Sequence, residues 1–186
     1  MKFLNGTRNK KLRVTADNLV VIKWHVDASF AVHPDYETFE GGEGSIMNLS
    51  RKQKLNTRSS TEAELVGVDD ASVLTSWTKL FLEALGCTVK KNVVHQDNKS
   101  AMLLETNGRQ SAGKRSRALN IRHFFITDQV EKGNAAVECC NAEDMVGDFH
   151  TKPVQGYKHK KFGDTIMGIS MFHIWNIVGS KGIMRV

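Results

Sequence analysis

Hydrophobic and polar residues alternate along residues 19–30 in the manner of a β-strand. Trp24 and Val26 fall on one face of this segment, and His25 and Asp27 fall on the other. The segment is rich in Val, Ile and Trp, so we predict a strand that is buried on at least one face. Further strands are predicted at residues 45–51, 88–95 and 135–139.

Apolar residues recur every three or four positions from Leu65 to Leu85, which predicts a long amphipathic helix with one buried stripe. Capping-box patterns at Ser59 and Thr61 mark its start, and Gly86 stands where a helix commonly ends. The length leaves room for a kink near residues 69–70. Shorter helices are predicted at residues 98–104, 120–130 and 141–150. Strands that alternate with helices favour an α/β layer fold with a partly parallel sheet.

The chain has 186 residues, 25% charged and 40% hydrophobic, which is typical of a folded globular domain and excludes a disordered or collagen-like chain. Lysine and arginine number 26 against 20 acidic residues, so the net charge of +6 favours a polyanionic partner. Three cysteines, two of them adjacent, make no disulfide framework, which fits a reducing compartment. Residues 1–14 lack the apolar segment of a secretory signal, and residues 166–178 are too polar to span a bilayer. We therefore expect an intracellular protein with no membrane partner.

Several acidic residues follow predicted strands or begin predicted helices. Asp27 lies near the end of the first strand, Asp97 follows a later strand, and Glu64 lies in the first turn of the long helix. Asp148 lies on a later predicted helix, on the same face as Asp144. The carboxyl ends of neighbouring strands meet at one edge of an α/β sheet, so these carboxylates are expected to converge and to require a hard cation such as Mg²⁺. Taken singly, each acid also fits a turn, a helix cap or a solvated helix face.

Four segments together carry a resemblance to a known family. They are residues 21–31 (VIKWHVDASFA), 52–65 (KQKLNTRSSTEAEL), 96–101 (QDNKSA) and 143–153 (EDMVGDFHTKP). In this order they resemble the ribonuclease H domain of copia-type retrotransposon Pol polyproteins, and the resemblance extends over about residues 3–168. It divides the chain into a connection-like segment at residues 1–19, a ribonuclease H-like domain at residues 20–165 and a divergent tail at residues 166–186.

The resemblance implies a ribonuclease H-like three-layer α/β fold, with a mixed sheet flanked by helices. It assigns the catalytic and metal-binding roles to Asp27, Glu64, Asp97 and Asp148. With two Mg²⁺ ions, or with Mn²⁺, which also suits oxygen ligands, these residues would hydrolyse the RNA strand of an RNA–DNA hybrid during reverse transcription. The implied partners are the hybrid and the reverse transcriptase portion of the same polyprotein. The implied location is the cytoplasm, a virus-like particle or the nucleus.

The second strand of the family pattern looks truncated in this chain. Relatives carry an additional apolar strand after the two glycines, where this chain has only residues 43–45 before the next segment. Residues 36–40 are the available replacement, but their polar pattern is a poor one for a strand. We therefore expect a shortened second strand beside the strand that carries Asp27, and weakened activity as a result.

Basic and polar residues near the predicted acidic edge are candidates for contact with nucleic acid, because lysine and arginine neutralise phosphates and polar side chains reach 2′-hydroxyls. The predicted nucleic-acid-binding residues are Ser29, Lys52, Lys54, Arg58, Asn98, Lys114, Arg115 and Arg117. Lys158, Lys160 and Lys161 form a third basic cluster, which we interpret as ordinary solvated surface.

Three other classes of function stay open at this point. A catalytically decayed, nucleic-acid-binding remnant of a Pol polyprotein would keep the basic surface without a working centre. An integrase-like or transposase-like protein of the same superfamily is disfavoured, because the motif SSTEAE at residues 59–64 falls on an early helix. A purely structural fragment of a polyprotein would not fold by itself.

Overall fold

The computed structural model describes residues 9–14, 21–28, 35–40, 44–51, 53, 57–108 and 125–169. Its strands are β1 (Val21–Asp27), β2 (Asp35–Glu40), β3 (Ser45–Arg51), β4 (Lys91–Gln96) and β5 (Ala136–Cys139). Its helices are α2 (Ser60–Ala84), α3 (Lys99–Asn107), α4 (Phe125–Glu131), α5 (Asp148–Thr151) and α6 (Gly156–Ile166). Within the described residues, no helix combines the length and the apolar character that a membrane crossing requires.

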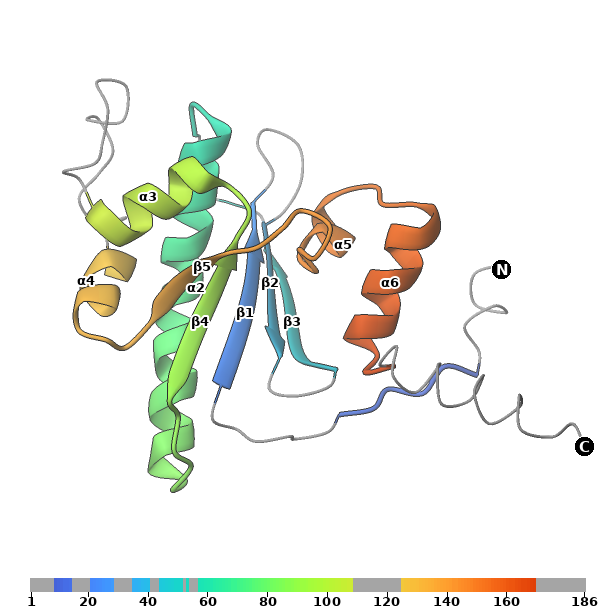
Figure 1. Cartoon of the computed structure of the whole chain (residues 1–186), viewed down its shortest axis with the longest axis horizontal. Coiled ribbons are helices and arrows are strands. Elements are labelled where there is room, and N and C mark those ends of the chain that lie inside the picture. Colours follow the sequence, from blue (N-terminus) through green and yellow to red (C-terminus); the bar gives the residue numbers. More distant parts are fainter. Residues whose placement is uncertain are drawn as a thin grey trace, which may run out of the picture.

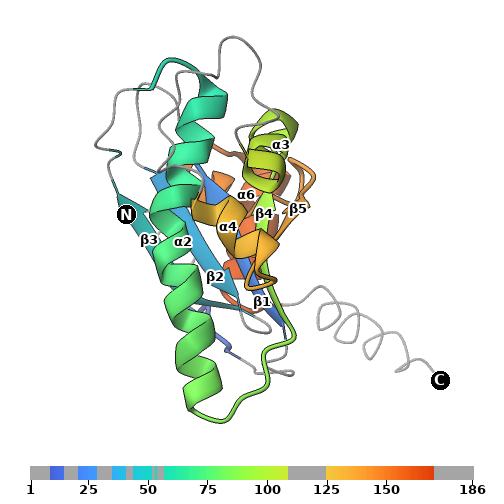
Figure 2. The ribbon, with the colours of Figure 1, turned by 90° about the vertical axis from the view of Figure 1, so that its left-hand side faces the viewer.

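The strands form one mixed five-stranded sheet in the order β3-β2-β1-β4-β5. The β1–β2 and β2–β3 pairs are antiparallel, whereas the β1–β4 and β4–β5 pairs are parallel. Helices α2, α3 and α4 cover one face of the sheet, and α5 and α6 lie on the other (Figure 1). Figure 2 shows α2 running along its face with α3 and α4 beside it. The predicted three layers and mixed sheet are therefore present, and they are compatible with a ribonuclease H-like fold.

The expectation of a truncated second strand is wrong. Strand β2 has six residues, a normal strand length, and pairs with β1 from Lys23↔Glu40 to Asp27↔Tyr36. Its other edge pairs with β3, so it is a central member of the antiparallel half of the sheet. The strand lies before the glycines at residues 41–42, on the polar segment that the sequence offered only as a poor replacement. Strand pairing uses backbone groups, which this polar segment supplies as well as an apolar one does.

Other boundaries differ from the prediction in smaller ways. Helix α2 is continuous over 25 residues, without the kink that its length allowed. Gly86 follows it with a φ of 86°, as a helix-ending glycine does. Residues 141–147 form turns, and only the short helix α5 follows them, because Asn141 accepts hydrogen bonds from the backbone of Glu143 and Asp144 and closes a turn instead of capping a helix. Of the helix predicted at residues 120–130, the first five residues lie outside the described part.

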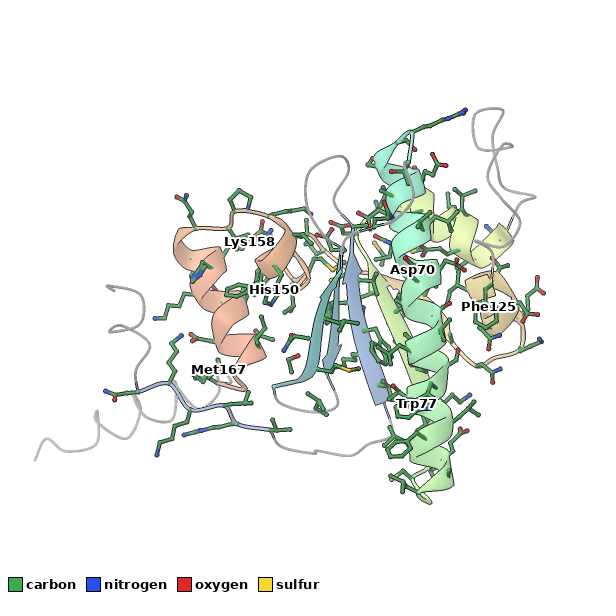
Figure 3. The ribbon with its side chains drawn as sticks, turned by 180° about the vertical axis from the view of Figure 1, so that it is seen from behind. Asp70, Trp77, Phe125, His150, Lys158 and Met167 are labelled. Carbon is green, nitrogen blue, oxygen red and sulfur yellow. The ribbon has the colours of Figure 1, made fainter. Side chains whose placement is uncertain are left out.

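The apolar stripe predicted along α2 is buried only in its first half. Leu65 and Val68 are fully buried against the sheet, whereas Trp77 is 56% exposed and stacks on the exposed ring of Phe81 at 5.0 Å. Trp77 lies towards the far end of the helix from the acidic edge (Figure 3). The periodicity identified the helix correctly, but the buried face of its second half passes through Thr75, Thr78 and Leu82 and leaves both aromatic rings exposed.

The core beneath α2 is organised around Trp24, whose side chain is completely buried. The indole Nε1 of Trp24 donates a hydrogen bond to Asn92 Oδ1 at 2.9 Å. Asn92 Nδ2 lies 3.3 Å from the carbonyl oxygens of both Thr75 and Asn134. One buried amide therefore joins β1, β4, α2 and the turn before β5.

We expect Asn92→Ala to lower the free energy of unfolding by about 3 kcal/mol. The substitution leaves the buried indole N–H of Trp24 and two backbone carbonyls without their hydrogen-bond partner. Chemical denaturation followed by tryptophan fluorescence would measure the change. Asn107→Ala, at an exposed position in α3, is the control and should change the same quantity by less than about 0.5 kcal/mol. Equal effects of the two substitutions would contradict the assigned role.

Candidate metal centre

Asp27 is the last residue of β1, and its side chain is completely buried. The Thr151 hydroxyl, from α5, donates a hydrogen bond to Asp27 Oδ2. The backbone N–H of the next residue, Ala28, donates to Glu64 Oε2 at 3.1 Å. At the end of β1, the Asp27 carboxylate is therefore held by a residue of α5. The next backbone N–H in turn holds the Glu64 carboxylate, which comes from α2.

The first turn of α2 separates its two glutamates. Ser59 caps the helix by accepting a hydrogen bond from the backbone N–H of Glu62, and the Glu62 carboxylate in turn accepts one from the backbone N–H of Arg58 at 2.7 Å. The Glu62 side chain is thus part of the N-terminal cap of α2. Glu64, two residues later, is only 5% exposed and turns towards the sheet.

Carboxylate oxygens of Asp27, Glu64 and Asp97 all lie within 4.8 Å of one another. Asp97 follows β4, the parallel neighbour of β1, so two strand ends and one helix start supply the three groups. Asp148, at the start of α5, is 2% exposed and joins this cluster through Lys152. All four acids predicted from the sequence therefore lie around one point at the edge of the sheet.

Lys152 is the counter-ion of this cluster. Its Nζ lies 2.5 Å from Asp148 Oδ1, 3.4 Å from Asp27 Oδ1 and 3.7 Å from Asp97 Oδ2. Lys158 approaches Asp148 from α6, with its Nζ 3.1 Å from the second carboxylate oxygen. Figure 3 places Lys158 on the side of the sheet opposite α2. Two ammonium groups therefore neutralise part of the negative charge.

The titration behaviour of the cluster reflects crowding and burial. Burial and the charges of Asp27 and Asp97 raise the pKa of Glu64 to about 9. Burial also raises the pKa of Asp27, and the Thr151 hydrogen bond and the Lys152 charge offset part of that rise. Burial by itself lowers the pKa of Lys152, but the hydrogen bond to Asp148 and the charges of Asp27 and Asp97 leave it above its usual value. A second positive charge at this point would stabilise the ionised carboxylates further.

The donor set fits a divalent cation. Closely spaced carboxylate oxygens are the ligands that Mg²⁺ and Mn²⁺ take, and nitrogen or sulfur ligands that would favour zinc do not belong to the three-residue group. Among the described residues, the acidic side chains of Asp27, Glu64 and Asp97 are close enough together to hold a metal ion.

Two glycines let helices approach the end of β1 very closely. A Cβ added at Gly67, in α2, would lie 3.1 Å from the Cβ of Ala28. A Cβ added at Gly147, just before α5, would lie 3.0 Å from the Cβ of Asp27. Side chains of successive strand residues point to opposite faces, so the strand end is held from both sides of the sheet.

The other predicted residues have different positions. Asn98 caps α3, because its Oδ1 accepts hydrogen bonds from the backbone of Ser100 and Ala101. Asn98 directly follows Asp97, and Arg58 precedes Ser59, the N-cap of α2. The remaining predicted nucleic-acid contacts lie outside the described residues: Ser29, Lys52, Lys54, Lys114, Arg115 and Arg117.

The site predicted from the sequence did not include the two lysines, Lys152 and Lys158, that pair with the clustered acids. Lys152 stands four residues after Asp148, the spacing at which helical side chains meet, so this signal was present in the sequence. Interpreting Lys158 as solvated surface is wrong, because its side chain is only 23% exposed and bonds to Asp148. Lys161 lies 2.5 Å from Asp144, whose side chain is 60% exposed, so Asp144 belongs to a separate surface pair.

We expect Lys152→Met to lower the melting temperature of the metal-free protein by about 3–6 °C, because the clustered carboxylates lose their counter-ion. Millimolar Mg²⁺ should raise the melting temperature of this variant more than that of the wild type, since the ion no longer competes with an ammonium. Thermal melts in EDTA and in Mg²⁺ would measure both effects. Lys132→Met, which removes one exposed pair with Asp128, is the control and should show neither.

We expect Gly147→Ala to cost about 1–3 kcal/mol of stability and to weaken divalent-ion binding, because the added methyl group pushes α5 and Asp148 away from Asp27. Gly163→Ala is the matched control, since its Cβ would meet the Phe149 ring at an ordinary 3.7 Å and alanine favours the interior of α6. Denaturation curves and Mn²⁺ titrations would be compared. Unchanged ion binding in Gly147→Ala would contradict the proposed close packing.

Comparisons with known proteins place the chain among mobile-element sequences. It is 30% identical over 173 residues to the retrovirus-related Pol polyprotein from transposon RE1 of Arabidopsis thaliana, an alignment that covers 89% of this chain and 12% of that protein. It is 28% identical over 162 residues to the corresponding polyprotein from transposon TNT 1-94 of Nicotiana tabacum, covering 83% of this chain and 12% of that protein. The polyprotein from transposon RE2 of Arabidopsis thaliana is 28% identical over 173 residues, with 89% and 12% covered.

The chain therefore spans only about an eighth of the length of these relatives. No family model matches it. Among solved structures, the prototype foamy virus protease–reverse transcriptase aligns with a TM-score of 0.42 and 17% identity, covering 74% of this chain and 17% of that one. Over most of its length, this chain is similar in sequence to a segment of the Pol polyproteins of copia-type retrotransposons.

Proposed function

We propose that this chain is a ribonuclease H-type endonuclease domain that hydrolyses the RNA strand of an RNA–DNA hybrid. The observation that carries the proposal is the convergence of Asp27, Glu64 and Asp97 within 4.8 Å, with Asp148 joined to them through Lys152. These acids come from four separate segments of the chain. Burying so many like charges at one point costs stability, which favours a functional cation site over a purely structural role.

Asp27, Glu64, Asp97 and Asp148 would hold two Mg²⁺ ions, or Mn²⁺. When bound, such a pair of ions lowers the pKa of an attacking water and stabilises the leaving 3′ oxygen of the RNA. The chain itself positions the ligands: Thr151 orients Asp27, and the backbone N–H of Ala28 orients Glu64. Lys152, which now pairs with Asp27, Asp97 and Asp148, would be the group available to pair with a phosphate oxygen of the hybrid.

A hybrid would be recognised through its backbone and groove shape. Asn98 directly follows Asp97, and the exposed Arg58 precedes the cap of the helix that carries Glu64, so both are proposed to meet a sugar or a phosphate. Basic residues outside the described part, Lys52, Lys54, Lys114, Arg115 and Arg117, complete the proposed electrostatic contact, with Ser29 as a hydroxyl contact. Neutralisation of phosphates by these groups makes hybrid affinity fall steeply with salt concentration.

The proposal extends to the setting of the domain. The domain corresponds to residues 20–165, between a connection-like segment and a divergent tail, and works together with the reverse transcriptase portion of the same polyprotein. Its location is the cytoplasm, a virus-like particle or the nucleus. A decayed remnant is the alternative function, but the presence of β2 removes the structural reason for expecting weakened activity.

The decisive test is Asp97→Asn, which removes one charge from the cluster while keeping the shape of the side chain. We expect cleavage of a hybrid with labelled RNA in Mg²⁺ to fall at least about 100-fold, because ion binding fails. Hybrid affinity, measured by fluorescence anisotropy in EDTA, should stay within about twofold of the wild type, since phosphate contacts lie elsewhere.

Asp144→Asn is the matched control, since Asp144 belongs to the surface pair with Lys161, and it should cleave at the wild-type rate. Hybrid cleavage by Asp97→Asn at the wild-type rate would refute the proposal. Tight hybrid binding without cleavage by the wild type would instead support the decayed remnant.

A further inference from the structure

Glu105, on α3, is a buried acid that the proposed mechanism does not use. Its side chain is completely buried, and its Oε2 has no hydrogen-bond partner among the described residues. Its other oxygen, Oε1, accepts from Gln96 Nε2 at 3.4 Å. Burial raises the pKa of Glu105 to about 8, and the hydrogen bond from Gln96 lowers it only in part, so the neutral form is favoured at pH 7. Burying a carboxyl group costs desolvation free energy, so a buried carboxyl is expected to make a specific hydrogen bond.

Gln96 connects this buried acid to the metal centre. It is the last residue of β4 and is completely buried. Its Oε1 accepts the backbone N–H of Asn98 at 3.1 Å, which fixes the oxygen end of the amide. Its Nε2 then lies between two carboxyl groups, 3.4 Å from Glu105 Oε1 and 3.5 Å from Glu64 Oε2. The two N–H donors of one side-chain amide match these two acceptors.

We propose that Glu105 is a positioning residue that acts through Gln96 to hold Glu64 in place as a metal ligand. This inference rests on the proposed function of the site. Without the Glu105 acceptor, one N–H of Gln96 loses its partner in a dry interior, and the amide gains freedom to rotate away from Glu64. Groups that hydrogen-bond to metal ligands without touching the metal typically contribute a factor of about 10–100 to metal affinity.

The test compares Glu105→Met, which keeps the length of the side chain and removes the acceptor, with Glu105→Gln, which retains an acceptor oxygen. Mn²⁺ titration followed by electron paramagnetic resonance would measure the affinity. We expect Glu105→Met to weaken Mn²⁺ binding about tenfold and Glu105→Gln to stay within about twofold of the wild type. Glu131→Met, at an exposed position in α4, is the control and should bind as the wild type does.

A double-mutant cycle distinguishes positioning through Gln96 from a general packing role. If Glu105 acts through Gln96, Gln96→Met should weaken Mn²⁺ binding to a similar extent, and adding Glu105→Met to it should weaken binding no further. Additive losses would overturn the proposal, and so would wild-type affinity in Glu105→Met. If thermal melts show that Glu105→Met is unfolded, Glu105→Ala takes its place in the same cycle.

A metal-free readout separates this inference from the proposed function. The ¹³C chemical shift of the Glu64 carboxyl carbon, recorded in EDTA, should change in Glu105→Met and return to the wild-type value in Glu105→Gln. A wild type that takes up no Mn²⁺ would refute the metal centre, while the shift would still decide whether Glu105 positions Glu64. An unchanged shift in Glu105→Met would overturn the inference.

Discussion

The mutual repulsion of carboxylates gathered at the end of β1 is the constraint on which the rest of this structure depends. Asp27, Glu64 and Asp97 stand within 4.8 Å of one another and are largely withdrawn from water, an arrangement that is unfavourable without positive charge. In the described structure, the ammonium of Lys152 supplies part of that charge through ion pairs with three acids. A proton on Glu64, whose pKa is raised to about 9, removes a further negative charge at neutral pH.

The fold serves this cluster by bringing strand ends and helix starts to one edge of the sheet. The parallel β1–β4 pair places Asp27 beside Asp97, and the close approach that Gly67 permits brings α2, with Glu64, onto the same strand end. Gly147 allows the equivalent approach from the opposite face. The short distances between the four carboxylates therefore depend on glycine at both positions, where a larger residue would push the helices away from β1.

The sequence predicted the acids better than it predicted their surroundings. Local signals, hydrophobic alternation and helix capping, place Asp27 at a strand end and Glu64 at a helix start, but their assignment as catalytic and metal-binding residues comes from the resemblance. Residues 36–40 predict a poor strand because they lack an apolar pattern, whereas the pairing of β2 depends on backbone groups and on neighbouring strands. The bridge from Glu105 through Gln96 to Glu64 joins three elements, so only the tertiary structure could bring it to light.

Two positive charges therefore offset the clustered carboxylates in the described structure: the ammonium of Lys152 and, as the raised pKa of Glu64 implies, a proton on that residue. A divalent ion at the proposed site would have to displace the proton and compete with the ammonium, so its affinity at neutral pH would be lower than the number of acids suggests. The sign follows from the raised pKa: as pH rises towards 9, fewer molecules hold the Glu64 proton, and the apparent affinity for the ion increases. A phosphate-bearing ligand would act in the same direction by attracting Lys152 away from the carboxylates, so ion binding and hybrid binding would reinforce each other.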